Sequence, residues 1–204
     1  MRDLEKKIKS KIKLKKEEKK QKLFSSAYKL FTTKGIKNTS IQDIVDSAEV
    51  AKGTFYLYFK DKYDIEEKLI IQKSCQLFNE ALKNLENNYI ENFDDEIIYV
   101  INYVIDELVK DNTLINFISK DLSLGVYNDK LARLMDNNEI GLYDVFINSV
   151  REKNIELENP DVTLFMIIEL VSSTCFTAIT KNIPLSINEY KPYLYSTIRK
   201  MLHN

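Results

Sequence analysis

The sequence of 204 residues is poor in the residues that break helices, with only four glycines and three prolines. So few chain breakers favour long helices over a sheet with many turns. Cys75 and Cys175 stand a hundred positions apart, which suits neither a disulfide framework nor a metal-binding pair. His203 is the sole histidine, so the sequence lacks the histidine ligands typical of zinc sites and gives no support for a histidine-based catalytic triad. We therefore predict an all-α protein that is not an enzyme and has no metal site and no cofactor.

The formal net charge of −1 hides an uneven distribution along the chain. Residues 1–22 hold 11 Lys and Arg against 4 Asp and Glu, whereas residues 71–204 hold 12 against 20. A polyanion is therefore expected at the N-terminal end. No apolar signal-peptide core is visible in residues 1–22, and the apolar run 162–180 is interrupted by Glu169, so it is interpreted as a buried helix. We expect a soluble, cytoplasmic protein that makes no membrane contact.

Apolar residues recur at helical spacing along almost the whole chain. Thr39 and Gln42 fit a capping box that opens a short helix ending near Ser47 or Ala48. The other helices are predicted over residues 19–34, 51–58, 61–87, 94–110, 113–124, 128–153, 160–181 and 187–203. We expect a basic extension over 1–22, a helix-turn-helix domain over 19–68 and a larger helical domain over 69–204.

A tight turn between the second and third short helices makes a helix-turn-helix candidate. The region is similar to the TetR-type transcriptional regulators from about Leu23 to Leu69. The matching motifs are Leu30-Phe31 with Gly35, Thr39-Ser-Ile-Gln-Asp-Ile44, and Ala48-Glu-Val-Ala-Lys-Gly-Thr-Phe-Tyr-x-Tyr-Phe-x-x-Lys62. Two residues depart from the family pattern. Glu49 stands where the family often has glycine, and Ala51 stands where a serine or threonine often caps the third helix.

The resemblance implies that the third helix lies in the major groove of DNA with its N-terminal residues near the base edges. Lys52 can reach a guanine or a phosphate, and Gly53 lets the backbone come close to the duplex. Phe55 and Phe59 are expected in the domain core, while Thr39 and Lys62 are expected to hold the phosphate backbone on either side. The DNA-binding residues are predicted to be Thr39, Lys52, Gly53, Thr54, Tyr56, Tyr58 and Lys62.

The lysine-rich extension, residues 1–22, is expected to strengthen DNA binding by displacing counterions from phosphates. Its lysines suit phosphate tethering better than reading of the minor groove, where arginine is the usual reader. A helix lying on a membrane surface is the alternative interpretation.

The resemblance also implies that the last two long helices form a four-helix bundle with a second copy of the chain. The interface is predicted to contain Phe165, Ser172, Cys175, Phe176, Ile179, Tyr190, Leu194 and Ile198. The same domain is expected to hold a mostly apolar ligand site. Its candidate residues are Tyr99, Tyr103, Phe117, Phe146, Met166 and Glu169. Glu169 is the only charge in its apolar run, and it could equally form a structural contact or face water.

These expectations describe a homodimeric repressor that leaves a near-palindromic stretch of double-stranded DNA when an unknown small-molecule effector binds. The alternative is a helical ligand-binding or scaffolding protein without DNA-binding activity.

Overall fold

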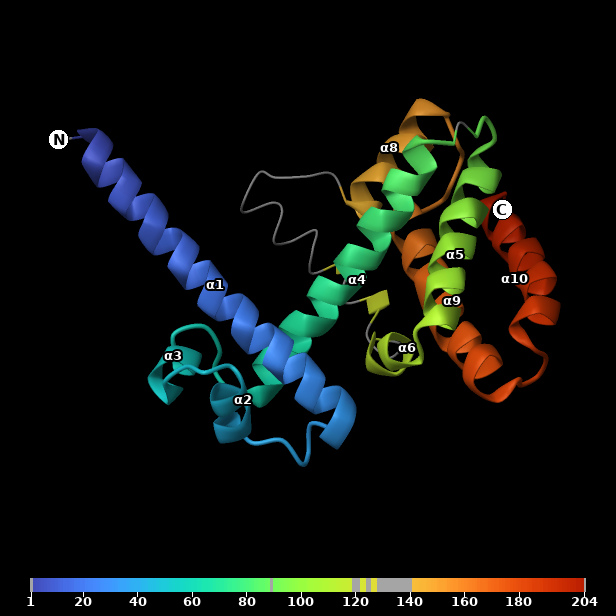
Figure 1. The fold of residues 1–204 in the computed structure, drawn as a ribbon. Helices are drawn as coiled ribbons and strands as arrows, with labels where there is room; N and C mark the ends of the chain where they lie inside the picture. The colour runs from blue at the N-terminus through green and yellow to red at the C-terminus, as the bar shows by residue number, and fades with distance from the viewer. Residues whose placement is uncertain (1, 89, 119–121, 124–125, 128–140, 204) are drawn as a thin grey trace. The chain divides into compact units, whose positions relative to one another are not determined.

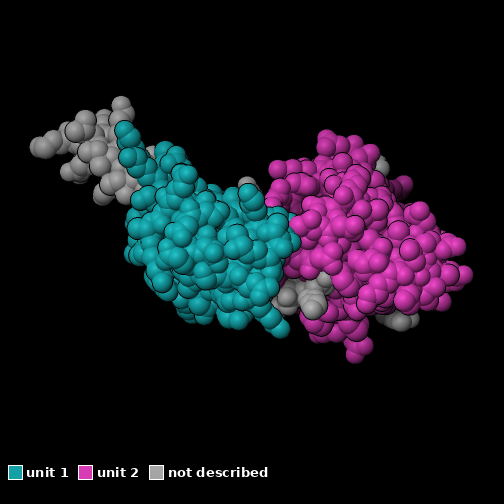
Figure 2. All heavy atoms as spheres, turned by 60° about the horizontal axis from the view of Figure 1, so that its bottom comes forward, with its two compact units in different colours: residues 1–69 teal, residues 70–204 magenta. Residues whose placement is uncertain are grey.

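A computed structural model describes residues 2–88, 90–118, 122–123, 126–127 and 141–203. These residues form helices joined by turns and loops, with no strand among them, which confirms the predicted all-α class. The chain divides into two compact units, residues 1–69 and 70–204, which Figure 2 shows in different colours.

The first unit contains α1 (Arg2–Lys34), α2 (Ile41–Ser47), α3 (Lys52–Tyr56) and the start of α4 (Lys62–Glu86). Figure 1 shows α1 as one long blue helix with α2 and α3 beside it. Its core contains a cluster of aromatic rings, in which the ring of Phe59 lies 5.1 Å from that of Phe24 and 5.5 Å from that of Phe55. Phe55 and Phe59 are buried, so the predicted core positions of both residues are confirmed.

Helix α2 begins one residue later than its predicted capping box requires. Ser40, not Thr39, is the N-cap, and its hydroxyl oxygen accepts a hydrogen bond from the backbone N–H of Asp43. The Asp43 carboxylate accepts a bond of 2.8 Å from the Ser40 N–H, which completes the box. The hydrogen bonds that Ser40 donates lower the pKa of Asp43 below its usual range. The Thr39–Gln42 box is therefore wrong by one position, because Thr39 and Ser40 have the same capping chemistry.

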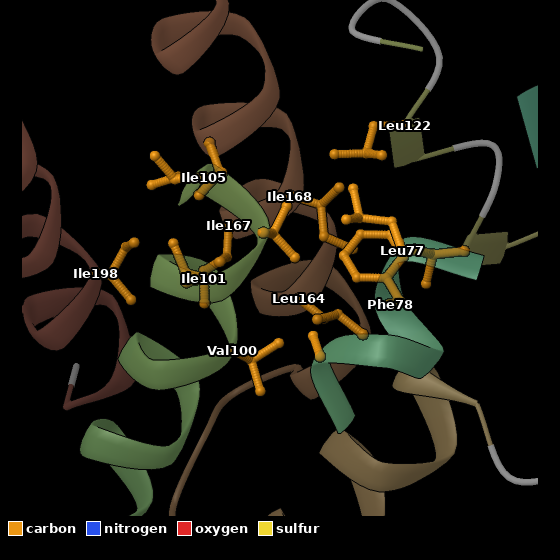
Figure 3. Close-up of a cluster of buried hydrophobic side chains, with 14 of the residues drawn as sticks. Leu77, Phe78, Val100, Ile101, Ile105, Leu122, Leu164, Ile167, Ile168 and Ile198 are labelled. Atoms are coloured by element: carbon orange, nitrogen blue, oxygen red, sulfur yellow. The ribbon is translucent and has the colours of Figure 1, made fainter. Parts of the chain in front are cut away.

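The second unit packs the rest of α4 with α5 (Phe93–Lys110), α6 (Asn112–Ile118), α8 (Leu142–Glu152), α9 (Pro160–Lys181) and α10 (Ile187–Leu202). Figure 3 shows its core, where side chains from α4, α5 and α9 point toward one another. The predicted helices over 94–110, 160–181 and 187–203 agree with α5, α9 and α10 to within one residue at each end. The helix predicted over 128–153 is confirmed where α8 lies, and residues 128–140 are outside the described residues.

Helix α9 is long and apolar enough to cross a membrane by length and composition, with a mean hydropathy of 1.9. It contacts α5, α6, α8 and α10, and eight of its residues are buried inside the second unit. A core helix of a soluble protein has this pattern of burial. The prediction that residues 160–181 form a buried helix is consistent with these contacts.

Candidate functional site

Helix α3 has one buried side and one open side. Phe55 is 0% exposed and anchors the helix to the core, whereas Tyr56 is 53% exposed and Leu57, directly after the helix, is 78% exposed. Lys52 and Gly53 are also exposed, and Thr54 is partly exposed. The open side therefore presents an ammonium group, a phenol and bare backbone to the same surroundings.

Gly53 keeps the backbone of α3 accessible. A Cβ atom placed on Gly53 would meet no atom within 4 Å, so the fold itself does not require a glycine at this position. A glycine inside a helix costs about 1 kcal/mol relative to alanine. The packing within the unit therefore gives no reason for a glycine at this position.

Tyr58 is a predicted DNA-binding residue, but its hydroxyl group already donates a hydrogen bond within the first unit. Its hydroxyl donates a hydrogen bond of 3.0 Å to the backbone carbonyl of Lys16 in α1. A phenol has one donor hydrogen, so in this arrangement it cannot also donate to a phosphate. The bond instead ties the lysine-rich part of α1 to the loop that follows α3.

Lys62 and Thr39 stabilise the loop between α1 and α2 from inside the domain. The ammonium group of Lys62 donates to the carbonyl oxygens of Ile36, Lys37 and Thr39 at 2.8, 3.3 and 3.0 Å. The buried hydroxyl of Thr39 donates to the Gly35 carbonyl at 2.9 Å. The structure therefore places both side chains in scaffold positions, because each donates to backbone carbonyls of the loop that follows α1.

The turn between α2 and α3 contains a residue with a strained backbone. Glu49 has φ of +55°, the left-handed conformation that favours glycine at a helix C-terminus. The backbone N–H of Val50 donates to the Val45 carbonyl at 3.0 Å, as expected for a Schellman motif. The departure noted from the sequence thus lies at the position that sets the direction of the chain into α3.

Asp61 and Asp64 hold the start of α4. The Asp61 carboxylate accepts bonds of 2.8 and 2.9 Å from the backbone N–H groups of Tyr63 and Asp64. Burial raises the pKa of Asp64, but hydrogen bonds from the Lys60 N–H and the Lys68 ammonium group outweigh it and leave the pKa below its usual value. Asp64 is thus charged near neutral pH.

The second unit encloses a cavity of about 330 Å³ between α4, α5, α8 and α9. Two apolar stripes with spacing i, i+4, i+7 supply part of its wall, one on α4 and one on α5. The lining residues are Phe78, Leu82, Leu85, Glu86, Asn88, Ile90, Glu96, Ile97, Val100, Ile101, Val104, Leu122, Leu142, Val145, Phe146, Ser149, Leu164, Ile167, Ile168 and Val171. Figure 3 shows several of them, including Phe78 and Ile168, on the core side of their helices.

Of the six predicted ligand-site residues, Phe146 is the one that lines this cavity. Tyr99 lies outside it and shares hydrogen bonds with Asn84 and Asn88. Met166 is 46% exposed on the outer side of α9. The three other residues that do not line the cavity are Tyr103, Phe117 and Glu169. The cavity is lined mainly by aliphatic residues on helix faces that also form the core, and neither aromatic character nor an isolated charge marks such residues in the sequence.

The predicted dimer residues fall into three groups. Four of them are buried in the core of their own chain, namely Ser172, Cys175, Leu194 and Ile198. Phe176, Ile179 and Tyr190 are partly buried against the same core. Phe165 alone of the eight is an exposed residue, at 46%. The reason is that α9 is apolar on more than one face, so helical spacing does not separate contacts within the chain from contacts between chains.

Comparisons with known proteins agree with this geometry. The sequence model described as "Bacterial regulatory proteins, tetR family" matches residues 23–69. An HTH-type transcriptional regulator of Staphylococcus aureus (strain USA300) is 24% identical over 181 residues, covering 87% of this chain and 90% of its own.

Solved structures of similar fold cover almost the whole chain. A TetR-family regulator from Syntrophomonas wolfei has a TM-score of 0.62 at 21% identity and covers 92% of this chain and 96% of its own. The transcriptional regulator FadR from Bacillus subtilis, solved in complex with stearoyl-CoA, has a TM-score of 0.60 at 18% identity, over 87% of this chain and 96% of its own. Residues 23–69 therefore match the tetR family of bacterial regulatory proteins, and the chain as a whole is similar to helix-turn-helix transcriptional regulators.

Proposed function

We propose that this regulator is a cytoplasmic homodimeric repressor that binds a near-palindromic DNA site through α3 and leaves it when a small molecule fills the cavity of the second unit. The observation that carries the DNA-binding part is the two-sided α3, in which buried Phe55 fixes a helix whose open side carries Lys52, Gly53 and Tyr56. A recognition helix needs this combination of a fixed anchor and a polar outer side.

Direct DNA contacts are assigned to the open side of α3. Lys52 reaches a guanine edge or a phosphate, Thr54 and Tyr56 donate to phosphates, and Gly53 permits close approach. Leu57 joins this set, because its exposed side chain beside Tyr56 suits contact with a thymine methyl group.

The other three members of the predicted set act indirectly. Thr39, Tyr58 and Lys62 hold α1 and the loop before α2 in place, through the hydrogen bonds described above.

The lysine-rich half of α1 is assigned a second, sequence-independent role at the DNA backbone. The bond between Tyr58 and the Lys16 carbonyl keeps this half of α1 beside the loop that follows α3. Lys11, Lys15 and Lys19 are exposed along it. Each phosphate neutralised by a lysine contributes about 0.9 to the slope of log affinity against log salt concentration.

The decisive experiment selects duplexes from a random library with the purified dimer and then measures variants on the selected site. Tyr56→Phe removes one hydrogen bond to a charged phosphate, worth about 1.5–3 kcal/mol, and is expected to weaken binding at least tenfold. Lys52→Ala is expected to weaken binding and to relax the preference at one base pair. Lys181→Ala, at the exposed end of α9, is the matched control and should bind as the parent does. Parental affinity in both α3 variants would mean that α3 does not face DNA.

A separate variant tests the role of α1. Replacing Lys11, Lys15 and Lys19 by Gln should lower the magnitude of the salt slope by up to about 3 and leave the base preference unchanged. An unchanged slope, together with loss of binding to anionic vesicles, would favour the membrane-surface interpretation instead.

The dimer surface is assigned to the exposed apolar side of α9 and α10. Val162, Phe165 and Met166 lie at i, i+3 and i+4 on α9 and are each 46–48% exposed, and Tyr193 on α10 is 66% exposed. Exposed apolar residues that share one side of a helix, as these three do on α9, mark an interaction surface. Phe165→Glu should convert the dimer to a monomer in analytical ultracentrifugation, whereas Val109→Glu, at a similarly exposed apolar residue on α5, should not.

Release by ligand follows from linkage between the two sites. A molecule that weakens DNA binding must itself bind more weakly to the DNA-bound dimer by the same factor. Release is proposed to act through α4, which supplies residues to both units. A scaffolding protein without DNA binding is the competing function, and failure to retain any duplex at low salt would establish it.

A further inference from the structure

The polar lining of the cavity is acidic at one end. Glu86 is the last residue of α4, and Glu96 lies in the first turn of α5. Both line the same cavity, together with Asn88 from the loop between the two helices and Ser149 from α8. All other lining residues are apolar. The cavity therefore combines a long apolar wall with two carboxylates at the junction of α4 and α5.

Basic residues are scarce around these carboxylates. The sequence has no Lys or Arg between Lys83 and Lys110, whereas it has several acidic residues there. Lys153 is a neighbouring cation, and its ammonium group is held by the Glu96 carboxylate at 2.9 Å and by the Glu91 carbonyl at 3.0 Å. No ion pair to Glu86 is formed within the described part of the chain. The end of the cavity where the polar residues gather thus carries an unbalanced negative charge.

We propose that this cavity binds a single-chain amphiphile with a cationic head group, whose ammonium group lies between Glu86 and Glu96 and whose tail lies against the aliphatic wall. This inference rests on the proposed function, because it names the ligand class of the site that the repressor would use for release. Charge complementarity selects the head group, since a second negative charge at this end would meet the partly buried Glu96 carboxylate and the exposed Glu86 carboxylate.

The volume of the cavity limits the tail. A methylene group needs about the space of one water molecule, about 30 Å³, so a cavity of about 330 Å³ accommodates roughly ten carbon atoms. This volume lies at the small end of the range of about 300–1,000 Å³ usual for ligand sites. The relative from Bacillus subtilis was solved with stearoyl-CoA. A ligand of that kind has a longer chain and several phosphates, and it fits neither the volume nor the charge found here.

The test compares three probes that share one ten-carbon tail: decyltrimethylammonium, 1-decanol and decanoate. Calorimetric titration of the full-length protein, without DNA and below micelle-forming concentrations, is expected to show the ammonium binding at least tenfold more tightly than decanoate. Decanol should lie between them. The affinity for the ammonium should fall with added salt, while that for decanol should not, because only the first depends on charge.

Substitutions of residues that line the cavity test whether the three probes bind there. Glu86→Gln with Glu96→Gln should reduce the preference for the ammonium over decanoate to below threefold, because Lys153 loses its carboxylate partner and is free to attract an anion. Ser149→Phe should weaken all three probes by filling the cavity. Glu156→Gln with Glu158→Gln removes the same charge from acidic residues that do not line the cavity, and it should change nothing.

Decanoate or decanoyl-CoA binding as tightly as the ammonium would overturn the inference, as would an unaltered preference in the Glu86 and Glu96 variant. The salt dependence of the parent protein decides the question if that variant fails to fold. Tight cation binding with no effect on DNA would support the ligand class and overturn the release mechanism proposed above. Failure of the duplex selection alone would leave the ligand class standing.

Discussion

Replacing Lys62 separates a scaffold role from a DNA contact. Its ammonium group donates to three backbone carbonyls of the loop between α1 and α2, at 2.8 to 3.3 Å. Lys62→Met keeps the length and apolar stem of the side chain and removes all three donors. The Ile36 carbonyl would keep the bond of 3.2 Å that it accepts from the Thr39 N–H, whereas the Thr39 carbonyl would have to find another donor or water.

The expected loss of stability follows from these bonds. A hydrogen bond from a charged donor contributes about 1.5–3 kcal/mol, but three bonds from one ammonium group are not additive. The side chain of Lys62 is only partly buried, so water recovers part of the loss. We expect a destabilisation of about 2 kcal/mol, which for a unit of this size lowers the melting temperature by roughly 10 °C.

Two measurements distinguish the roles of Lys62. Thermal unfolding followed by circular dichroism should show the loss in Lys62→Met and not in Lys60→Met, its exposed neighbour. DNA binding, measured well below the melting transition, should keep its salt slope. An unchanged melting temperature combined with a salt slope reduced by about 1 would refute the reasoning, because that pair of results is the signature of a phosphate contact.

Three further predictions concern stability. Glu49→Gly should stabilise the first unit by about 0.5–1 kcal/mol in urea unfolding, since it relieves a left-handed residue, whereas Asp46→Gly inside α2 should destabilise it by about 1 kcal/mol. Burial raises the pKa of the Cys175 thiol to about 12. The folded chain then keeps a proton that the unfolded chain releases, so stability should fall between about pH 9 and 12, and less steeply in Cys175→Ala. Lys191→Met should destabilise the second unit by about 1 kcal/mol, because it removes the hydrogen bonds that the ammonium group donates to Asp106 and Asn102 while the Asp106 carboxylate, 47% exposed, stays partly hydrated; Asp106→Asn keeps an acceptor for Lys191 and should cost less in the same urea titration.

The sequence was sufficient to predict α5, α9 and α10 to within one residue at each end, and the inner side of α3. Spacing alone separates Phe55 from Tyr56, because adjacent residues on a short helix point about 100° apart and only one of them can face the core. The start of α4 was equally predictable, since Asp61 and Asp64 are local signals that need no distant partner.

The direction taken by a long side chain was not predictable. Lys62 stands at the start of a helix, where a phosphate contact is a sound expectation, yet its ammonium group turns inward to carbonyls 23 to 26 residues earlier in the sequence. Those acceptors exist only after the turn at Gly35 has closed, with φ of +79°. The destination of the side chain therefore depends on tertiary structure and has no signal in its immediate sequence.

The sequence of α9 does not show which of its apolar side chains stay exposed after the chain folds. Phe165 and Cys175 both lie on an apolar helix, and a partner chain is a plausible neighbour for each of them. After folding, Cys175 is 1% exposed and Phe165 is 46% exposed, because α9 lies against α10 and α5 with one side only. The exposed side is the one still able to bury apolar area on association, at about 25 cal/mol for each Å². A search for the partner surface should therefore begin at Phe165 and Met166, which remain 46% exposed in the folded chain.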